Sequence, residues 1–326
     1  MITNKEKNFI SAVLYVHNSE NEIKEFLPII YQSLNSRYDK FEIICVNDGS
    51  TDHSQDIVEE YQKKFPGKII GLMKKNGGLA DARNYGLAHA NGDYVAFIDS
   101  DDWVEADMFK VMYQQVVKKQ ADVVVCDMQY VYESGETKFV PGGEFTETNV
   151  SNDPLIITIN NSACNKLFKR SLFDDVKFPK GLWYEDLGCV PIVLAKANKI
   201  VKVNHVFYNY FQRAGSIMHT PSDKIFDIYR ALDLVKSYVV KNKIPCLDEV
   251  NYMFVEHGAK LTTQRIREYQ NGREVFLNQN ITTLSSKYPK WIKNKYINTY
   301  SKKEKVLMYL LYLRQFKLVL WLYDRK

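Results

Sequence analysis

The sequence is poor in cysteine and has no paired cysteine motif, and this excludes two classes of protein. Its five cysteines are spread through 326 residues, and no two are separated by only two residues. Disulfide scaffolds and cysteine-ligated zinc sites need closer cysteines in larger numbers. We therefore expect reduced, mostly buried thiols in a cytosolic protein; they are Cys45, Cys126, Cys164, Cys189 and Cys246.

Long hydrophobic runs are also missing. A membrane-spanning helix needs about 20 consecutive apolar residues, and the nearest stretch, Val306–Tyr323, is interrupted by Arg314 and Lys317. Residues 1–8 are polar and charged, unlike the apolar centre of a secretory signal. The expected location is therefore the cytoplasm.

The sequence has no net positive charge outside the last segment. Residues 281–326 carry eleven Lys and Arg against two Asp and Glu, and the first 280 residues have a net charge of −4. A main body of this kind does not attract nucleic acid. We expect no nucleic-acid partner, although RNA binding by the basic tail remains an alternative.

What the sequence does contain is an alternation of apolar runs and helical stretches over residues 9–130. This alternation predicts an α/β fold with a mainly parallel central sheet, in which ligands bind beyond the carboxyl ends of the strands. The expected strands are 9–16, 41–46, 68–73, 94–98 and 122–126, and the expected helices are 20–34, 52–64, 79–90 and 105–119.

Beyond residue 130 the pattern changes twice. A helix is expected over 185–198 and a strand over 200–211, and from about residue 222 the strand signal fades. Helices are then expected over 225–240, 249–269, 273–285 and 302–323. This predicts a domain boundary near residue 220, with a mostly helical region over 221–326.

Two turn motifs follow predicted strands. The first, Asn47–Asp52, is either a simple strand–turn–helix connection or a site where Asp48 accepts a hydrogen bond from a base or ribose. The second, Asn76–Asn84, contains the pair Gly77 and Gly78 before a helix. Glycines let a ligand approach the backbone, and the N–H groups of a helix start favour anions. Arg83 is then either a surface arginine or a phosphate ligand.

An acidic motif, Asp99-Ser100-Asp101-Asp102, directly follows the apolar run 94–98. Three carboxylates this close repel one another, and a divalent cation resolves the conflict. Their hard oxygen atoms suit Mg²⁺ or Mn²⁺. The alternative is a solvated acidic turn that caps the next helix.

A second acidic pair, Glu185-Asp186, begins a predicted helix and follows Trp183-Tyr184. The carboxylates either cap the helix or include a general base. The aromatic pair is a possible platform for one face of a sugar ring.

Taken in order, these four segments resemble the family 2 glycosyltransferases, which have the GT-A fold. The matching stretches are Asn47–Asp52, Asn76–Asn84, Asp99–Asp101 and Glu185-Asp186, and the segments 165–170 and 208–217 resemble bacterial members that build surface polysaccharides such as capsule. The resemblance implies inverting, metal-dependent transfer of a sugar from a nucleotide sugar, with UDP as the expected nucleotide, to a glycan, lipid-linked or protein-linked hydroxyl. A non-catalytic binding protein with the same fold is the alternative.

The resemblance also implies a role for each matching residue. Asp186 would be the catalytic base, with Glu185 as the second candidate, and Asp101 and Asp99 would hold Mn²⁺ or Mg²⁺. Residues about 1–130 would bind the nucleotide sugar and about 131–220 the acceptor. The nucleotide-sugar ligands would be Val16, Asn18, Asp48, Gly77, Gly78, Arg83, Asp99 and Ser100, and the acceptor or loop residues would be Trp183, Tyr184, Arg213 and His219.

Two features depart from the family pattern or lie outside it. Family members usually end the first strand with Pro-x-Tyr-Asn, but this chain has Tyr15-Val16-His17-Asn18. Backbone contacts to a base can survive this change, whereas the side-chain contribution differs. The basic segment 302–323 is expected to be a helix that packs on its own domain, forms a homodimer interface, or lies on an anionic membrane surface.

Overall fold

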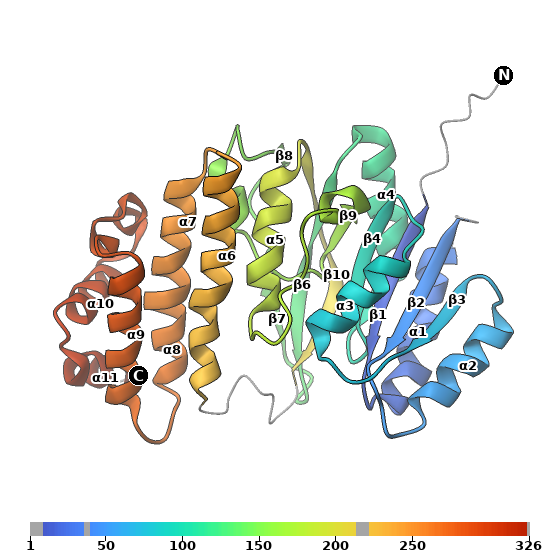
Figure 1. Cartoon of the computed structure of the whole chain (residues 1–326), viewed down its shortest axis with the longest axis horizontal. Coiled ribbons are helices and arrows are strands. Elements are labelled where there is room, and N and C mark those ends of the chain that lie inside the picture. Colours follow the sequence, from blue (N-terminus) through green and yellow to red (C-terminus); the bar gives the residue numbers. More distant parts are fainter. Residues whose placement is uncertain (1–8, 36–39, 213–221, 325–326) are drawn as a thin grey trace. The chain divides into compact units, whose positions relative to one another are not determined.

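The computed structural model describes residues 9–35, 40–212 and 222–324. Contacts divide the chain into two compact units (Figure 1). The first contains the described residues of 1–181 and 189–213, and the second contains those of 182–188 and 214–326. The predicted boundary near residue 220 lies outside the described residues.

The first unit is built around one sheet with the strand order β3-β2-β1-β4-β9-β6-β10-β5, in which β7 pairs with β6 and β8 with β10 (Figure 1). The strands are β1 (Ile10–Val16), β2 (Phe41–Asn47), β3 (Ile69–Met73), β4 (Tyr94–Asp99), β5 (Trp103–Val104), β6 (Val123–Tyr132), β7 (Thr137–Val140), β8 (Glu147–Thr148), β9 (Lys166–Lys169) and β10 (Ile200–Gln212).

The longest pairings in this sheet are parallel. β1 pairs in parallel with β2 and β4, β2 with β3, and β6 with β10. The shorter strands β5, β7, β8 and β9 pair antiparallel with their neighbours. The predicted α/β fold with a mainly parallel central sheet is confirmed, and β9, which the sequence did not predict, joins β4 to β6.

Helices cover both faces of the strands near β1. The unit contains α1 (Glu20–Asn35), α2 (Ser54–Lys64), α3 (Leu79–His89), α4 (Met108–Lys119) and most of α5 (Glu185–Lys196). Ala12 and Leu14 belong to the core that includes the buried face of α1. Val13 points the other way, toward Gly86 of α3, where an added Cβ would lie 2.4 Å from Val13 Cγ1. Alternating side chains of β1 therefore bury both faces, which explains its continuous apolar sequence.

Among the described residues of the second unit, all the regular secondary structure is helical. It contains α6 (Asp227–Lys241), α7 (Leu247–Met253), a π-helical stretch (Phe254–Leu261), α8 (Thr262–Ile266), α9 (Arg273–Lys287), α10 (Lys302–Tyr312) and α11 (Phe316–Asp324). Short 3-10 helices lie at Pro154–Thr158 and Arg170–Phe173 in the first unit and at Asp223–Phe226, Trp291–Lys293 and Lys295–Thr299 in the second.

One helix prediction is wrong in detail. The segment 302–323 is not a single helix, because α10 ends at Tyr312 and α11 begins at Phe316. Arg314 lies between them with a φ of 56°, a left-handed conformation that cannot continue a right-handed helix. All five cysteines are free and buried, as predicted. None of the helices formed by the described residues is both long and apolar enough to cross a membrane.

Candidate active site

Three of the predicted motifs meet at one edge of the sheet. β1, β2 and β4 are parallel neighbours, and their registers pair Val16 with Asn47 and Tyr15 with Asp99. Asp48 follows directly after β2, and its N–H donates to the Val16 carbonyl over 2.9 Å. The carboxyl ends of the strands therefore bring the Asn47–Asp52 turn and the Asp99–Asp102 motif together.

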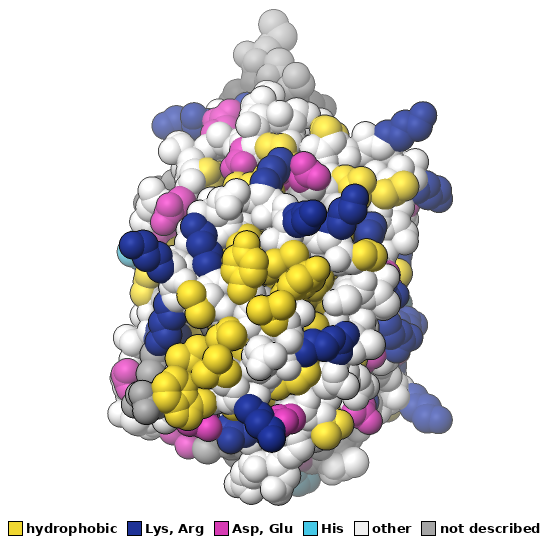
Figure 2. Space-filling model, turned by 90° about the vertical axis from the view of Figure 1, so that its left-hand side faces the viewer, with side chains coloured by type: hydrophobic (Ala, Val, Ile, Leu, Met, Phe, Trp, Pro, Cys, Tyr) yellow, Lys and Arg dark blue, Asp and Glu magenta, His cyan; other side chains and the backbone are white. Residues whose placement is uncertain are grey.

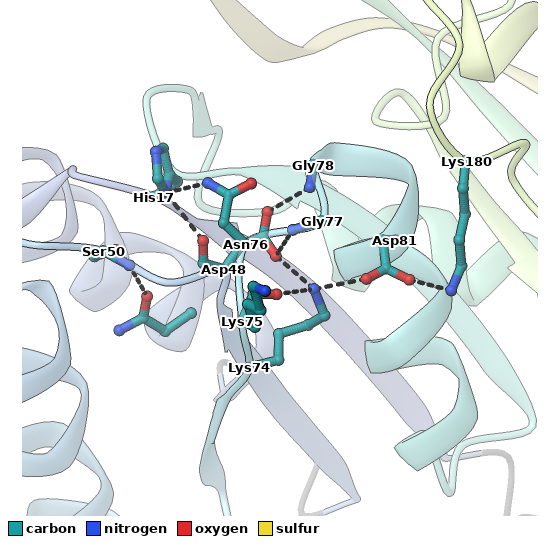
Figure 3. Close-up of polar contacts among 11 residues, drawn as sticks. His17, Asp48, Ser50, Lys74, Lys75, Asn76, Gly77, Gly78, Asp81 and Lys180 are labelled. Atoms are coloured by element: carbon teal, nitrogen blue, oxygen red, sulfur yellow. Dashed lines mark hydrogen bonds and ion pairs between the residues drawn. The ribbon is translucent and has the colours of Figure 1, made fainter.

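Asp48 is the centre of this edge (Figure 3). Its side chain is fully buried, and its Oδ1 accepts hydrogen bonds from Lys74 Nζ at 2.6 Å and from the Gly77 N–H at 2.9 Å. Its Oδ2 accepts from the Gly78 N–H at 2.7 Å. One carboxylate thus joins the end of β2 to the glycine turn that precedes α3.

A chain of alternating charges continues from Asp48 (Figure 3). Lys74 also contacts Asp81 at 2.7 Å, and Asp81 forms a second ion pair with Lys180. Burial lowers the pKa of Lys74, but the hydrogen bonds that Lys74 donates to Asp48 and Asp81 outweigh this effect and raise the pKa overall. Lys180 and Lys74 together lower the pKa of Asp81. Lys74 therefore stays charged, and its contacts with Asp48 and Asp81 hold the turn in place.

The sequence predicts that the backbone at Gly77 and Gly78 is open to a ligand, and the structure differs from this prediction. Both N–H groups are already engaged with Asp48. Gly78 has a φ of 83°, which favours glycine, and a Cβ at Gly77 would lie 2.3 Å from Asp81 Oδ2. The pair is needed for the conformation of the turn, and its N–H groups serve Asp48 in this structure.

The other predicted residues of the β1 end also make structural contacts. Asn18 Oδ1 accepts from the Thr51 N–H at 2.8 Å, and its own N–H donates to Ser50 Oγ at 3.0 Å. Ser100 Oγ donates to Ser19 Oγ at 2.8 Å. These contacts fix the loops after β1, β2 and β4 relative to one another.

Arg83 is not the surface arginine that one interpretation of the sequence allowed. Its side chain is 2% exposed, and Nη2 lies 3.0 and 3.2 Å from the two carboxylate oxygens of Asp99. Its guanidinium carbon lies 5.5 Å from the centre of the Phe178 ring. The first turns of α3 therefore place a buried cation against the first carboxylate of the acidic motif.

The three carboxylates of the acidic motif have separate environments. Asp102 is buried and accepts from Tyr208 Oη at 2.6 Å and from the Phe211 N–H at 2.9 Å. Burial, followed by the charges of Asp99 and Asp101, raises the pKa of Asp102 well above its usual range. Asp102 thus anchors β10, whereas Asp99 pairs with Arg83 at the edge site.

Tyr15 lies among the carboxylates of this edge. Burial is the first cause that raises its pKa, and the charges of Asp48, Asp99 and Asp101 add to it, giving a value of about 12. Asp48 and Asp99 are each paired with a cation, so the negative charge near Tyr15 is partly balanced within the protein. Within the described residues, no group of three or more His, Cys, Asp or Glu side chains is arranged to hold a metal ion. A cation there would need ligands from the substrate as well.

The second acidic pair belongs to the second unit. Glu185 and Asp186 form the first turn of α5 and are half-buried. Tyr184, just before them, has a φ of 66° and its Oη accepts from Arg265 Nη1 at 2.6 Å. The Arg265 guanidinium carbon lies 5.0 Å from the centre of the Trp183 ring.

Arg265 changes the interpretation of the aromatic pair. Arg265 lies over one face of the Trp183 ring, so a sugar platform at Trp183 would use the other face. The same contacts fix the residues that lead into Asp186. The two loop residues, Arg213 and His219, lie outside the described residues.

Sequence reasoning missed Lys74, Lys180 and Arg265. Lysine and arginine are common on surfaces, and nothing in their local sequence marks them as partners of distant side chains. Tyr208 was part of a segment that carried the resemblance, but its bond to Asp102 depends on the pairing of β10 with β5 and β6.

The order of strands in the sheet defines an α/β domain of the GT-A type. Solved structures agree with this fold. The chain aligns with S. aureus TarS 1-349 in complex with UDP-GlcNAc at a TM-score of 0.69 and 21% identity, over 96% of this chain and 89% of that chain. With the UDP complex of TarS 1-349, the TM-score is 0.72 at 20% identity over the same shares.

The family model described as glycosyl transferase family 2 matches residues 11–177. The chain is 33% identical over 245 residues to glycosyltransferase GlyG of Streptococcus pneumoniae serotype 4, covering 71% of this chain and 79% of GlyG. It is 31% identical over 229 residues to a poly(ribitol-phosphate) beta-glucosyltransferase of Bacillus spizizenii, covering 67% of this chain and 35% of that protein. It also matches about a third of the length of S. pneumoniae glycosyltransferase GlyA.

The chain belongs to glycosyl transferase family 2 and is a glycosyltransferase.

Proposed function

We propose that the chain transfers a sugar, with inversion at the anomeric carbon, from a UDP-sugar to a hydroxyl group of a surface glycan or of a lipid-linked or protein-linked precursor. The observation that carries the proposal is that Asp48 and the acidic motif from Asp99 to Asp101 follow parallel strands on either side of β1, at the same carboxyl-end edge of the sheet. The UDP-GlcNAc complex of TarS, which shares the fold, supports UDP as the nucleotide. The names of relatives that act on teichoic acid support a surface polymer as the product.

Each residue of the edge site has a proposed task toward the donor. Asp48, whose side chain is fully buried, would serve the base or ribose by holding in place the glycine turn on which they lie. Arg83, held against Asp99, would balance negative charge near the leaving diphosphate. Val16, Asn18, Ser100, Gly77 and Gly78 would shape the surface on which the nucleotide lies.

The acidic motif fits a divalent cation of the hard, oxygen-binding kind. Mg²⁺ is usually held by one or two carboxylates, with substrate phosphates and water completing its shell. Asp101, with Asp99 beside it, would hold Mn²⁺ or Mg²⁺ in this way. Such an ion supplies positive charge that stabilises a leaving diphosphate.

Asp186 is the proposed base, with Glu185 as the second candidate. It would take the proton of the acceptor hydroxyl while the acceptor oxygen forms a bond to the anomeric carbon. The bond from that carbon to the diphosphate oxygen breaks, and UDP leaves with the electron pair. Inversion follows because the two oxygens occupy opposite faces of the sugar.

Calorimetric titration tests the donor and the metal. We expect one UDP-sugar to bind in the presence of Mn²⁺ or Mg²⁺ and to bind far more weakly in EDTA. An Asp101→Asn variant should lose this metal dependence. Failure of UDP and of every UDP-sugar to bind would contradict the proposed donor.

An Asp186→Asn variant tests the base. Loss of a positioned general base slows catalysis by about 10²–10⁴-fold, so we expect kcat to fall by that factor while the Kd of the UDP-sugar stays near its wild-type value. Glu185→Gln is the matched control. A normal rate in Asp186→Asn together with a slow rate in Glu185→Gln would show that Glu185, and not Asp186, is the general base.

We also propose that the enzyme works at the inner face of the cytoplasmic membrane. α10 and α11 expose large apolar and aromatic side chains, including Tyr309 at 57%, Leu313 at 60% and Trp321 at 45% exposure. Figure 2 shows apolar side chains gathered on this face of the C-terminal helices, with Lys and Arg around them. Aromatic side chains and lysines are the residues that settle at the surface of an anionic bilayer.

A further inference from the structure

A cavity of about 490 Å³ lies beside the acidic motif in the first unit. Its volume is in the range typical of small-molecule sites. It is lined by residues of α1, β5 and β10 and by the loop after β4: Asn21, Glu22, Glu25, Phe26, Ile29, Asp101, Trp103 and Phe211.

One helix face supplies much of the lining. Glu22, Glu25, Phe26 and Ile29 are spaced by three and four residues and so share one face of α1. The opposite face holds the buried residues Ile23, Leu27, Ile30 and Leu34. The helix therefore has one face in the core and a second face whose half-buried apolar residues, Phe26 and Ile29, line the cavity.

The apolar wall of the cavity is aromatic. The rings of Phe26 and Trp103 stack with 5.5 Å between centroids at 25°, and the Phe211 ring lies 6.5 Å from Trp103. These three side chains come from three different elements, so the fold assembles the wall. Flat aromatic faces pack well against the C–H face of a sugar ring, which is apolar although the ring carries hydroxyl groups.

Polar groups border the aromatic wall. Asn21 and Glu25 are exposed and supply an amide and a carboxylate, which can accept and donate hydrogen bonds to hydroxyl groups in the pattern a sugar requires. Asp101 belongs both to this lining and to the acidic motif. The cavity is therefore adjacent to the proposed donor site, shares Asp101 with it and is otherwise built from other residues.

We propose that this cavity is an acceptor subsite that binds a sugar unit of the growing glycan, with one face of the sugar ring against the aromatic wall and its hydroxyls toward Asn21 and Glu25. The assignment rests on the proposed function, because it concerns the acceptor of that reaction. It names the acceptor class as a glycan with an unsubstituted ring face next to the attacked sugar.

Direct binding tests the subsite without any catalysis. The full chain, saturated with UDP, is titrated with N-acetylchitotriose and with cellotriose and followed by saturation-transfer NMR. We expect at least one trisaccharide to bind at millimolar concentration, and Phe26→Ala and Glu25→Gln to weaken that binding about five- to tenfold. Phe139→Ala and Glu60→Gln, exposed residues on β7 and α2, are the matched controls and should bind like the wild type.

Failure of the two proposals can be told apart. If neither trisaccharide binds, or if Phe26→Ala and Glu25→Gln bind as tightly as their controls, the subsite is overturned even when UDP-sugar binding is normal. If UDP-sugars do not bind but the trisaccharide binds and depends on Phe26, the proposed donor fails and the sugar-binding cavity stands. Thermal unfolding of each variant separates lost binding from lost fold.

Discussion

At the scale of single residues, the edge site is held together by charges that are already paired. Asp48 is buried, and its charge is balanced by Lys74 and by two backbone N–H groups. Asp99 is balanced by Arg83. A site of this kind is organised before the donor arrives, so little rearrangement is needed when it binds.

A Lys74→Met variant tests this organisation. It removes the cation between Asp48 and Asp81 and leaves the buried Asp48 without its charged partner. We expect a loss of about 2 kcal/mol in the free energy of unfolding, since breaking a buried pair is costly. Urea unfolding measures the loss.

The neighbouring Lys75 provides the control. Its side chain is exposed, so Lys75→Met should change the free energy of unfolding by less than about 0.5 kcal/mol. Equal stability of the two variants would mean that the pairing of Lys74 contributes nothing, and the preorganisation argument would lose its support.

At the scale of elements, the sequence predicted the main strands and helices better than the short segments that connect or interrupt them. The strands at residues 10–16, 41–47 and 94–99 were found because buried parallel strands are continuously apolar. β9 was missed because it has only four residues, Lys166–Lys169, and both ends are lysine. The break at Arg314 was missed because apolar residues continue on both sides of it, and only the backbone conformation separates α10 from α11.

The same contrast applies to the site. The acidic motif and the two turns could be located because a strand precedes each of them. The different environments of Asp99, Asp101 and Asp102 could not be predicted, because they depend on Arg83 and Tyr208, which come from α3 and β10. Side chains that meet only after folding leave no pattern in a local stretch of sequence.

The start of α10 gives a prediction about pH. Ser301 and Glu304 form a capping box, in which Glu304 accepts from the Ser301 N–H at 2.9 Å, and Glu304 also pairs with Lys260 at 3.0 Å. Hydrogen bonds from Ser301, followed by Lys260, lower the pKa of Glu304 from 4.5 to about 2. Because the folded value is depressed, this stabilisation is present above pH 4.5 and is lost as the pH falls toward 2.

We therefore expect Glu304→Gln to reduce the free energy of unfolding at pH 7 by about 1 kcal/mol, a value that allows for screening of a partly exposed group. The variant should also flatten the dependence of stability on pH between 4.5 and 2. Chemical unfolding at a series of pH values measures both effects. Glu274→Gln, in the first turn of α9, is the control, and a pH dependence unchanged by Glu304→Gln would contradict the assignment.

At the scale of the whole molecule, the uneven charge and the exposed apolar face of α10 and α11 occur in the same segment. In a flotation assay, we expect the full chain to rise together with vesicles that contain phosphatidylglycerol. We expect it to stay at the bottom of the gradient when the vesicles are made of phosphatidylcholine alone. Flotation should weaken as salt is raised, since the charge interaction is screened.

The double variant Tyr309→Ser, Leu313→Ser should float less, because it removes two of the most exposed apolar side chains of α10 and its following turn. Val117→Ser, Phe139→Ser removes two equally exposed side chains from α4 and β7 and is the control. If the first variant floats like the control but changes from dimer to monomer in light scattering, the face is a contact between two copies instead.

The order of strands in the sheet has a consequence for the time course of synthesis. β6 is made directly after α4, yet it is joined to β4 only through β9, which is made about forty residues later. A nascent chain that has left the ribosome as far as residue 165 therefore carries an open edge on β4 and another on β6, both of which can pair with other chains. Four residues, Lys166–Lys169, close both edges at once, so the period before they emerge is when this protein is most exposed to misassembly.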